Sequence, residues 1–137
     1  MKKYKNILIA CDSNTKDDSQ IFECVNSLKE DNQAKVSMVH VLETPYMFEG
    51  AYEFEYEFEN SDKLCELADK MKIPQDRVFI KNGDVGQKIL NVAESIKADL
   101  IILGNHGRHG LSAFFFGNTG SKLMERVGCD VLAHKIA

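Results

Sequence analysis

The chain alternates between short apolar runs and longer stretches in which apolar residues recur at helical spacing. Each apolar run is followed by turn-forming or polar residues, which is typical of strands. The five predicted strands are Lys5–Cys11, Ala34–Val41, Arg77–Lys81, Asp99–Leu103 and Asp130–Ile136. Apolar positions spaced by three and four predict helices between them. The four predicted helices are Asp17–Glu30, Asn60–Met71, Val85–Ile96 and Asn118–Val127.

Strands that alternate with helices predict crossover connections and a parallel sheet. Lys5–Cys11 has no polar alternation, as expected of a strand that is covered on both faces. We therefore expect one α/β domain over residues 1–137, a doubly wound five-stranded parallel sheet with helices on both faces. Such sheets bind ligands beyond the carboxyl ends of their strands, where the strand order reverses. The residues expected at that edge are Asp12, Val41, Gly83 and Gly104.

The composition narrows the class of protein. A chain of 137 residues with 44% hydrophobic and 28% charged residues can build one globular core. Its apolar stretches are too short to span a membrane, and the start lacks the apolar segment of a signal peptide. We therefore expect a cytoplasmic protein. The formal net charge of −4 argues against nucleic acid as a partner, because phosphate binding needs a concentrated basic surface.

The cysteines give no sign of a metal or redox site. They lie far apart, with no C-x-x-C pair and no histidine at ligand spacing. In a reducing compartment they are expected to be free thiols that are mostly buried. The four positions are Cys11, Cys24, Cys65 and Cys129.

Glycines recur in the segment Gly104–Ser121, which follows the fourth predicted strand. Gly104 and Gly107 would let the backbone turn tightly and approach a ligand closely. Gly117 precedes a predicted helix, whose first amide groups are suited to bind phosphate. On the spacing alone, a structural loop with positive φ explains the glycines equally well.

The spacing of these glycines follows a specific pattern. Gly-x-x-Gly, nine residues, then Gly and a small polar residue resembles the nucleotide motif of the universal stress protein family. The most diagnostic stretch is Asp99–Gly107 followed by Arg108, and the resemblance covers essentially the whole chain. It implies a five-stranded α/β fold of the Rossmann-like, adenine nucleotide alpha hydrolase-like type. It also implies a homodimer through Asp130–Ile136 and, in one branch of the family, ATP binding without strong catalysis.

The resemblance implies roles for residues at the first strand ends. Asp12 would contact the ribose or the adenine, and Val41 would contact the adenine through its backbone. Leu103, Gly104 and Gly107 would border the ribose and the phosphates. The chemistry is compatible, because a carboxylate accepts hydrogen bonds from ribose hydroxyls and a strand-end amide and carbonyl can read the adenine edge.

The resemblance places the terminal phosphates at Gly117, Asn118 and Thr119, with Arg108 nearby as a cation. The ATP-binding branch has Ser or Thr directly after the third motif glycine, whereas this chain has Asn118. Asparagine can donate a hydrogen bond to phosphate but is bulkier. The branch that resembles universal stress protein A lacks the intact motif and is thought not to hold ATP. The expected ligand is therefore ATP, with or without Mg²⁺, and the alternative is a nucleotide-free dimeric interaction protein.

The sequence does not support efficient catalysis. It has no Gly-x-x-x-x-Gly-Lys-Ser/Thr loop, no Gly-x-Ser-x-Gly elbow and no convincing nucleophile–base pair, which leaves at most slow ATP hydrolysis. His106 and His109 are expected to be loop histidines facing solvent, since no ligating residue stands beside them. His40, in an apolar run, is expected to be a satisfied histidine of the core or of the end of the sheet.

Tyr52–Glu59 alternates strictly between aromatic residues and glutamates. At period two this alternation sorts the rings to one face and the carboxylates to the other. Two interpretations remain open: a connection into the second helix with some rings on the core, or an extended arm whose aromatic face meets a second subunit or a partner.

Overall fold

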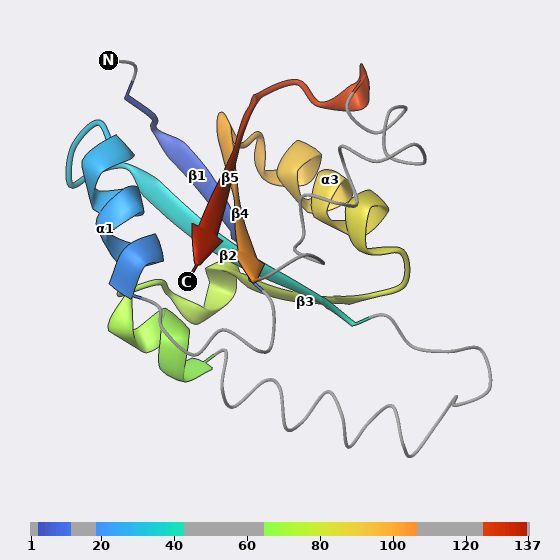
Figure 1. The fold of residues 1–137 in the computed structure, drawn as a ribbon, viewed down its shortest axis with the longest axis horizontal. Coiled ribbons are helices and arrows are strands. Elements are labelled where there is room, and N and C mark those ends of the chain that lie inside the picture. Colours follow the sequence, from blue (N-terminus) through green and yellow to red (C-terminus); the bar gives the residue numbers. More distant parts are fainter. Residues whose placement is uncertain (1–2, 12–18, 43–64, 107–124, 137) are drawn as a thin grey trace.

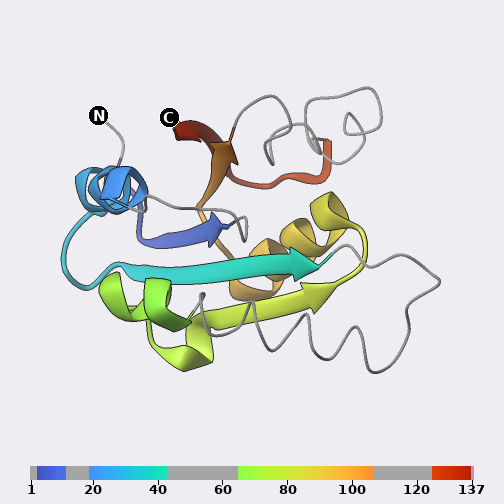
Figure 2. The same cartoon turned by 60° about the horizontal axis from the view of Figure 1, so that its bottom comes forward.

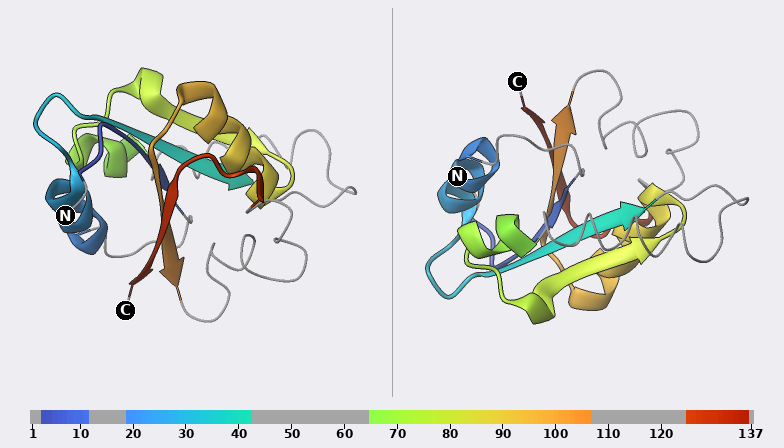
Figure 3. Two further views of the ribbon diagram at one scale, coloured as in Figure 1. Left: turned by 90° about the horizontal axis from the view of Figure 1, so that it is seen from above. Right: turned by 90° about the horizontal axis from the view of Figure 1, so that it is seen from below.

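The fold is built on a five-stranded sheet in which every pair of neighbouring strands is parallel (Figure 1). The computed structural model describes residues 3–11, 19–42, 65–106 and 125–136. The strands are β1 (Asn6–Ala10), β2 (Lys35–Leu42), β3 (Val78–Asn82), β4 (Leu100–His106) and β5 (Asp130–Ile136). Their order is β3-β2-β1-β4-β5, so β1 is central and β3 and β5 form the two edges (Figure 3).

Helices cover both faces of this sheet, as the sequence predicts. Helix α1 (Ser19–Leu28) and a helical segment at residues 65–70 lie on one face, and α3 (Val85–Ile96) lies on the other (Figures 1 and 2). A short 3-10 helix, η1 (Gln75–Arg77), leads into β3. The α/β class and the doubly wound parallel sheet are thus confirmed.

Two apolar clusters form the core, one on each face of the sheet. On β1, Ile7 and Ile9 pack into the cluster under α1, whereas Leu8 and Ala10 pack into the cluster under α3. Successive side chains of a strand point to opposite faces, so a strand covered on both sides must be apolar at every position. This is why β1 lacks polar alternation: Ile7, Leu8 and Ile9 are each 0% exposed.

Strand β4 is longer than the sequence predicts. The expected end was Leu103, but β4 continues through Gly104 to His106. The extension is paired to β5, with Gly104 opposite His134 and His106 opposite Ile136. The hydrogen bonds that extend β4 are made with β5, which lies about thirty positions later in the chain. The residues around Gly104 therefore give no local sign of them.

The cysteines differ from the expectation in one respect. All four carry thiols and none is in a disulfide. Cys11 is buried, but Cys24, Cys65 and Cys129 are only half-buried, so the expectation that most are buried is wrong. Burial still raises the pKa of Cys24. In the ranges given above, no helix has the length and apolarity required to cross a bilayer.

Candidate functional site

The strand order reverses between β1 and β4, and this reversal marks the expected ligand edge. From β1 the chain proceeds to β2 on one side, whereas from β4 it proceeds to β5 on the other. Ligands of open α/β sheets bind beyond the carboxyl ends of the strands at such a reversal. The candidate site is therefore the carboxyl edge around the end of β1.

The strand register places three of the predicted binding residues around this point. Ala10, the last residue of β1, is paired with Val39 on one side and with Leu103 on the other. Gly104 therefore follows on the β4 side of β1, and Val41 lies two residues beyond Val39 on the β2 side. The structure brings these strand ends together, as the sequence predicts.

The remaining predicted binding residues lie outside the described ranges. These are Asp12, Gly107, Arg108, Gly117, Asn118 and Thr119. Their assignment stays a prediction, as does the role of the alternating segment Tyr52–Glu59.

Leu103 and Val41 have different surroundings. The Leu103 side chain is 0% exposed and belongs to the cluster under α3. Only the backbone of Leu103 could therefore face a ligand. Val41 is half-buried and packs against the edge of the same cluster, so its side chain offers a partly apolar surface at the strand end.

Gly104 and His106 belong to a strand, which corrects two expectations. Gly104 was expected in a tight turn, but it is a buried residue within β4. His106 was expected in a loop, but its backbone is part of β4 as well. A glycine in a strand lets another group approach the backbone closely, so Gly104 remains a candidate binding residue for a different reason.

His40 lies at the same edge, although the sequence predicts no functional role for it. Its side chain is 4% exposed, and Nδ1 is 2.9 Å from the backbone oxygen of Cys11. The other ring nitrogen, Nε2, is buried and has no hydrogen-bond partner in the described part of the chain. The expectation of a sheet-end histidine is confirmed, but the ring is satisfied at only one nitrogen. A histidine in the last residues of an apolar strand was the available signal.

The start of α3 lies at this edge too, but the amide group of Gln87 in its first turn is already engaged by a carboxylate. Gly83 has φ 130°, a conformation that favours glycine, and it directs the chain from β3 into the helix. Asp84 caps α3: its Oδ2 accepts from the backbone N–H of Gln87 at 2.9 Å. A carboxylate at this position opposes binding of a phosphate there.

A hollow lies at the opposite, amino end of the sheet. Its volume is about 260 Å³, and it is lined by Leu90, Ala93, Glu94, Lys97, Ala98, Gly128 and Cys129. Glu94 is already paired with Arg126 at 3.2 Å. Burial, with Asp130 and Asp99 nearby, raises the pKa of Cys129, so its thiol is protonated at neutral pH and is a poor nucleophile.

The described residues at the carboxyl edge are partly apolar and carry few polar side chains. Within the ranges that the structure covers, no cluster of three or more His, Cys, Asp or Glu side chains could hold a metal. Half-buried Val41, the side-chain-free Gly104 and the unpartnered His40 Nε2 instead offer a partly apolar surface with one hydrogen-bond acceptor. Small-molecule sites commonly combine these features.

Comparisons with known proteins agree with this architecture. The universal stress protein A homolog 2 of Coxiella burnetii is 30% identical over 144 residues, which cover 99% of this chain and 98% of that protein. The homolog 1 of the same organism is 30% identical over 139 residues and 95% of each chain.

Solved structures share the fold at lower identity. A universal stress protein in complex with cAMP has a TM-score of 0.65 at 16% identity, covering 98% of both chains. The universal stress protein UspA from Lactobacillus plantarum has a TM-score of 0.58 at 20% identity, covering 97% of this chain and 99% of that one. The model of the universal stress protein family matches residues 3–135. The chain therefore belongs to the universal stress protein family.

Proposed function

We propose that this protein binds ATP or a related adenine nucleotide at the carboxyl edge of its sheet. In this proposal it acts in the cytoplasm as a dimeric regulator of a stress response, and it is not an efficient catalyst. The observation that carries the proposal is the reversal of strand order between β1 and β4, beside which Gly104 and Val41 lie.

The chemistry of the edge supports an adenine nucleotide. Val41 ends a buried strand segment with a half-buried side chain, and a flat base can rest on such a surface while the backbone reads its edge. Gly104 lacks a side chain, which leaves room for the sugar. The Gly104–Ser121 motif would then supply amide groups for the phosphates.

The family adds support without deciding the ligand. One solved universal stress protein is in complex with cAMP, which is itself an adenine nucleotide. Bound nucleotide would act here through Gly104–Ser121, by changing the surface that this segment offers to a protein partner. Such an effect requires different nucleotide affinities in the two states of the segment.

The direct test is to denature freshly purified protein and analyse the released small molecules, together with calorimetric titration of ATP, with and without Mg²⁺, and of cAMP. We expect released adenine nucleotide or saturable binding. An absence of nucleotide in both measurements would contradict the proposal and favour the nucleotide-free dimeric interaction protein.

In this proposal Asn118 lies beside the terminal phosphates and limits how tightly they are held. We expect Asn118→Ser to strengthen ATP binding by roughly two- to tenfold, the value of one added hydrogen bond to phosphate. Asn118→Ala is the matched control, because it removes the bulk of the side chain and adds no hydroxyl. Equal affinities of Asn118→Ser and the wild type would show that this position does not limit binding.

The nucleotide-free alternative has its own supporting observation. Strand β5 lies at an edge of the sheet that the described residues form, and an edge strand can pair with another chain. An isologous dimer across β5 would cover the β5 edge of each copy and requires no ligand. The homodimer is therefore proposed in both cases, and only the titrations distinguish them.

A further inference from the structure

His40 lies in the last row of residues in which β1 and β2 are in contact. Ala10 is paired with Val39, and the backbone N–H of the next residue, Cys11, still donates to Val39 O at 3.0 Å. His40 is therefore opposite Cys11, at the point where β1 ends. Val36 and Met38 pack into the cluster under α1, and alternation along the strand places His40 on that same face.

The hydrogen bond to Cys11 defines the protonation of the ring. A carbonyl oxygen only accepts hydrogen bonds, so Nδ1 of His40 must carry the proton and donate at 2.9 Å. In the neutral ring Nε2 is then a bare acceptor. It lies across the ring from Nδ1 and points away from the Cys11 oxygen. The ring is thereby held in one orientation with its acceptor on the far side.

That acceptor is buried and unused. Nε2 has no partner within the described structure, and His40 is only 4% exposed. Buried polar groups of native proteins nearly always have a protein, water or ligand partner, because an unsatisfied group loses its hydration without compensation. Protein atoms bury Nε2 and the bond to Cys11 fixes the ring, so what is missing is a donor; His40 stands next to the ligand edge, where a bound ligand can supply one.

We propose that Nε2 of His40 accepts a hydrogen bond from the bound nucleoside, either from a ribose hydroxyl or from the exocyclic amino group of the base. His40 is then a specificity-determining residue that selects ligands with a donor at this position. This inference rests on the proposed binding of an adenine nucleotide. It goes beyond that proposal by assigning a contact to the side chain of His40, next to the backbone contact expected of Val41.

Two substitutions of His40 test the roles of the two ring nitrogens separately. In His40→Asn the side-chain amide lies near the position of Nδ1, so the donor to Cys11 O is kept and the Nε2 acceptor is lost. In His40→Gln the terminal amide reaches the position of Nε2, so an acceptor is kept and the bond to Cys11 is lost. Chemical denaturation of both full-length variants monitors folding separately from binding.

The probes are ATP, its two monodeoxy analogues and purine riboside triphosphate, which lacks the exocyclic amine. We expect wild-type protein to bind one of these three analogues about tenfold or more weaker than ATP, because the analogue without the donor leaves Nε2 unpaired. His40→Asn should bind ATP about tenfold weaker and should no longer distinguish that analogue. His40→Gln should keep part of the discrimination even if its stability falls.

A measurement on wild-type protein avoids any variant that fails to fold. In ¹⁵N NMR spectra of the His40 ring, the free protein should show a protonated Nδ1 and a bare Nε2, and saturating ATP should shift the Nε2 resonance. An unchanged Nε2 resonance at saturation, or an equal loss of affinity for every probe in His40→Asn, would overturn the inference and indicate a structural role only. If wild-type protein binds none of the probes, the proposed function fails first, and this inference fails with it.

Discussion

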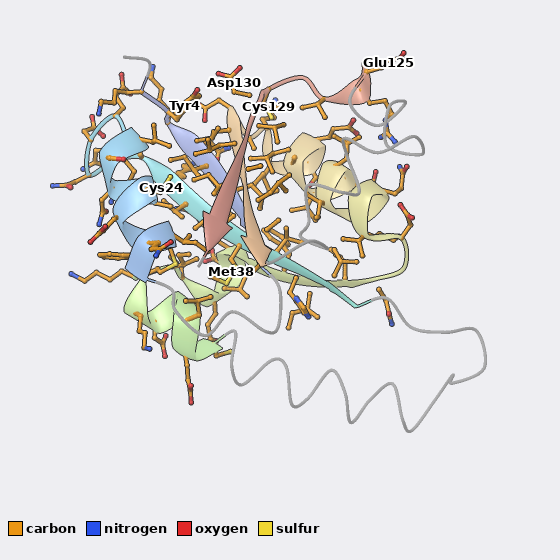
Figure 4. All side chains as sticks on the ribbon, in the orientation of Figure 1. Tyr4, Cys24, Met38, Glu125, Cys129 and Asp130 are labelled. Atoms are coloured by element: carbon orange, nitrogen blue, oxygen red, sulfur yellow. The ribbon has the colours of Figure 1, made fainter. Side chains whose placement is uncertain are left out.

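Tyr4 is the residue that joins the start of the chain to its last strand. Its ring is 9% exposed and belongs to the cluster under α1, while its hydroxyl donates to Asp130 Oδ2 at 2.7 Å. Figure 4 shows Tyr4, Cys129 and Asp130 together at one end of the sheet. The hydrogen bond to Asp130 raises the pKa of Tyr4 above its ordinary value of 10.0, and burial adds to this effect.

This raised pKa predicts a specific dependence of stability on alkaline pH. The protonated phenol is the form that the folded state favours, so its contribution is complete below the unfolded pKa of about 10. It is lost as the pH rises through the higher pKa of the folded state. We expect Tyr4→Phe to be less stable than the wild type at pH 8, with the difference shrinking toward pH 11. Urea denaturation at both pH values would measure this. A difference that does not depend on pH would contradict the assigned hydrogen bond.

For single residues, the sequence predicted the place in the fold better than the burial and the hydrogen bonds of the side chain. Val41, Leu103 and Gly104 do lie at the carboxyl edge, because strand ends follow from the apolar runs. The complete burial of Leu103 depends instead on neighbours in β1 and α3, and the half-satisfied ring of His40 depends on Cys11. Such contacts join residues far apart in the chain, and local pattern carries no information about them.

Helix α3 shows which elements a sequence can define. It was predicted over Val85–Ile96 and is observed over the same residues. Its apolar stripe is regular, Asp84 caps its start, and Lys97 ends it in the left-handed conformation with φ 57°. The apolar stripe and the capping residue are local signals. The end of β4 was misplaced because it depends on pairing with β5, which is not a local signal.

The cap of α3 leads to a prediction for this element. Asp84→Ala removes the acceptor of the Gln87 N–H and should reduce the free energy of unfolding by about 1 kcal/mol. Asp84→Asn is the matched control, since its side-chain oxygen also caps well, and it should stay close to the wild type. Thermal and urea denaturation of the three proteins would decide. If Asp84→Asn is as unstable as Asp84→Ala, the negative charge matters rather than the cap.

For the whole molecule, the class of fold was predictable and the strand order was not. Alternating strands and helices imply a parallel sheet, but periodicity does not say which strands are neighbours. The order β3-β2-β1-β4-β5 leaves β5 at one edge and so gives the proposed dimer its surface. Along β5 the backbone groups alternate between β4 and the outside. The N–H of Asp130 donates to Asp99 O on the β4 side at 3.4 Å, so the N–H groups of Val131 and Ala133 face outward.

This alternation allows a substitution that affects the outer edge without breaking the sheet. Ala133 is exposed, and Ala133→Pro removes one outward-facing N–H while leaving the bonds to β4 in place. If two copies pair across β5, sedimentation at micromolar concentration should show a wild-type dimer and an Ala133→Pro monomer with an unchanged far-ultraviolet circular dichroism spectrum.

Ala133→Ser keeps the N–H and adds a polar group at the same exposed position, so it should remain dimeric and serve as the control. Comparison of the wild type with the two variants distinguishes three outcomes, because only Ala133→Pro lacks the backbone N–H of position 133. A dimer in all three proteins would place the interface elsewhere on the molecule, and a wild-type monomer would refute the homodimer directly. Only loss of the dimer in Ala133→Pro, with retention in Ala133→Ser, assigns it to the edge hydrogen bonds of β5, because these two variants differ in whether position 133 can donate.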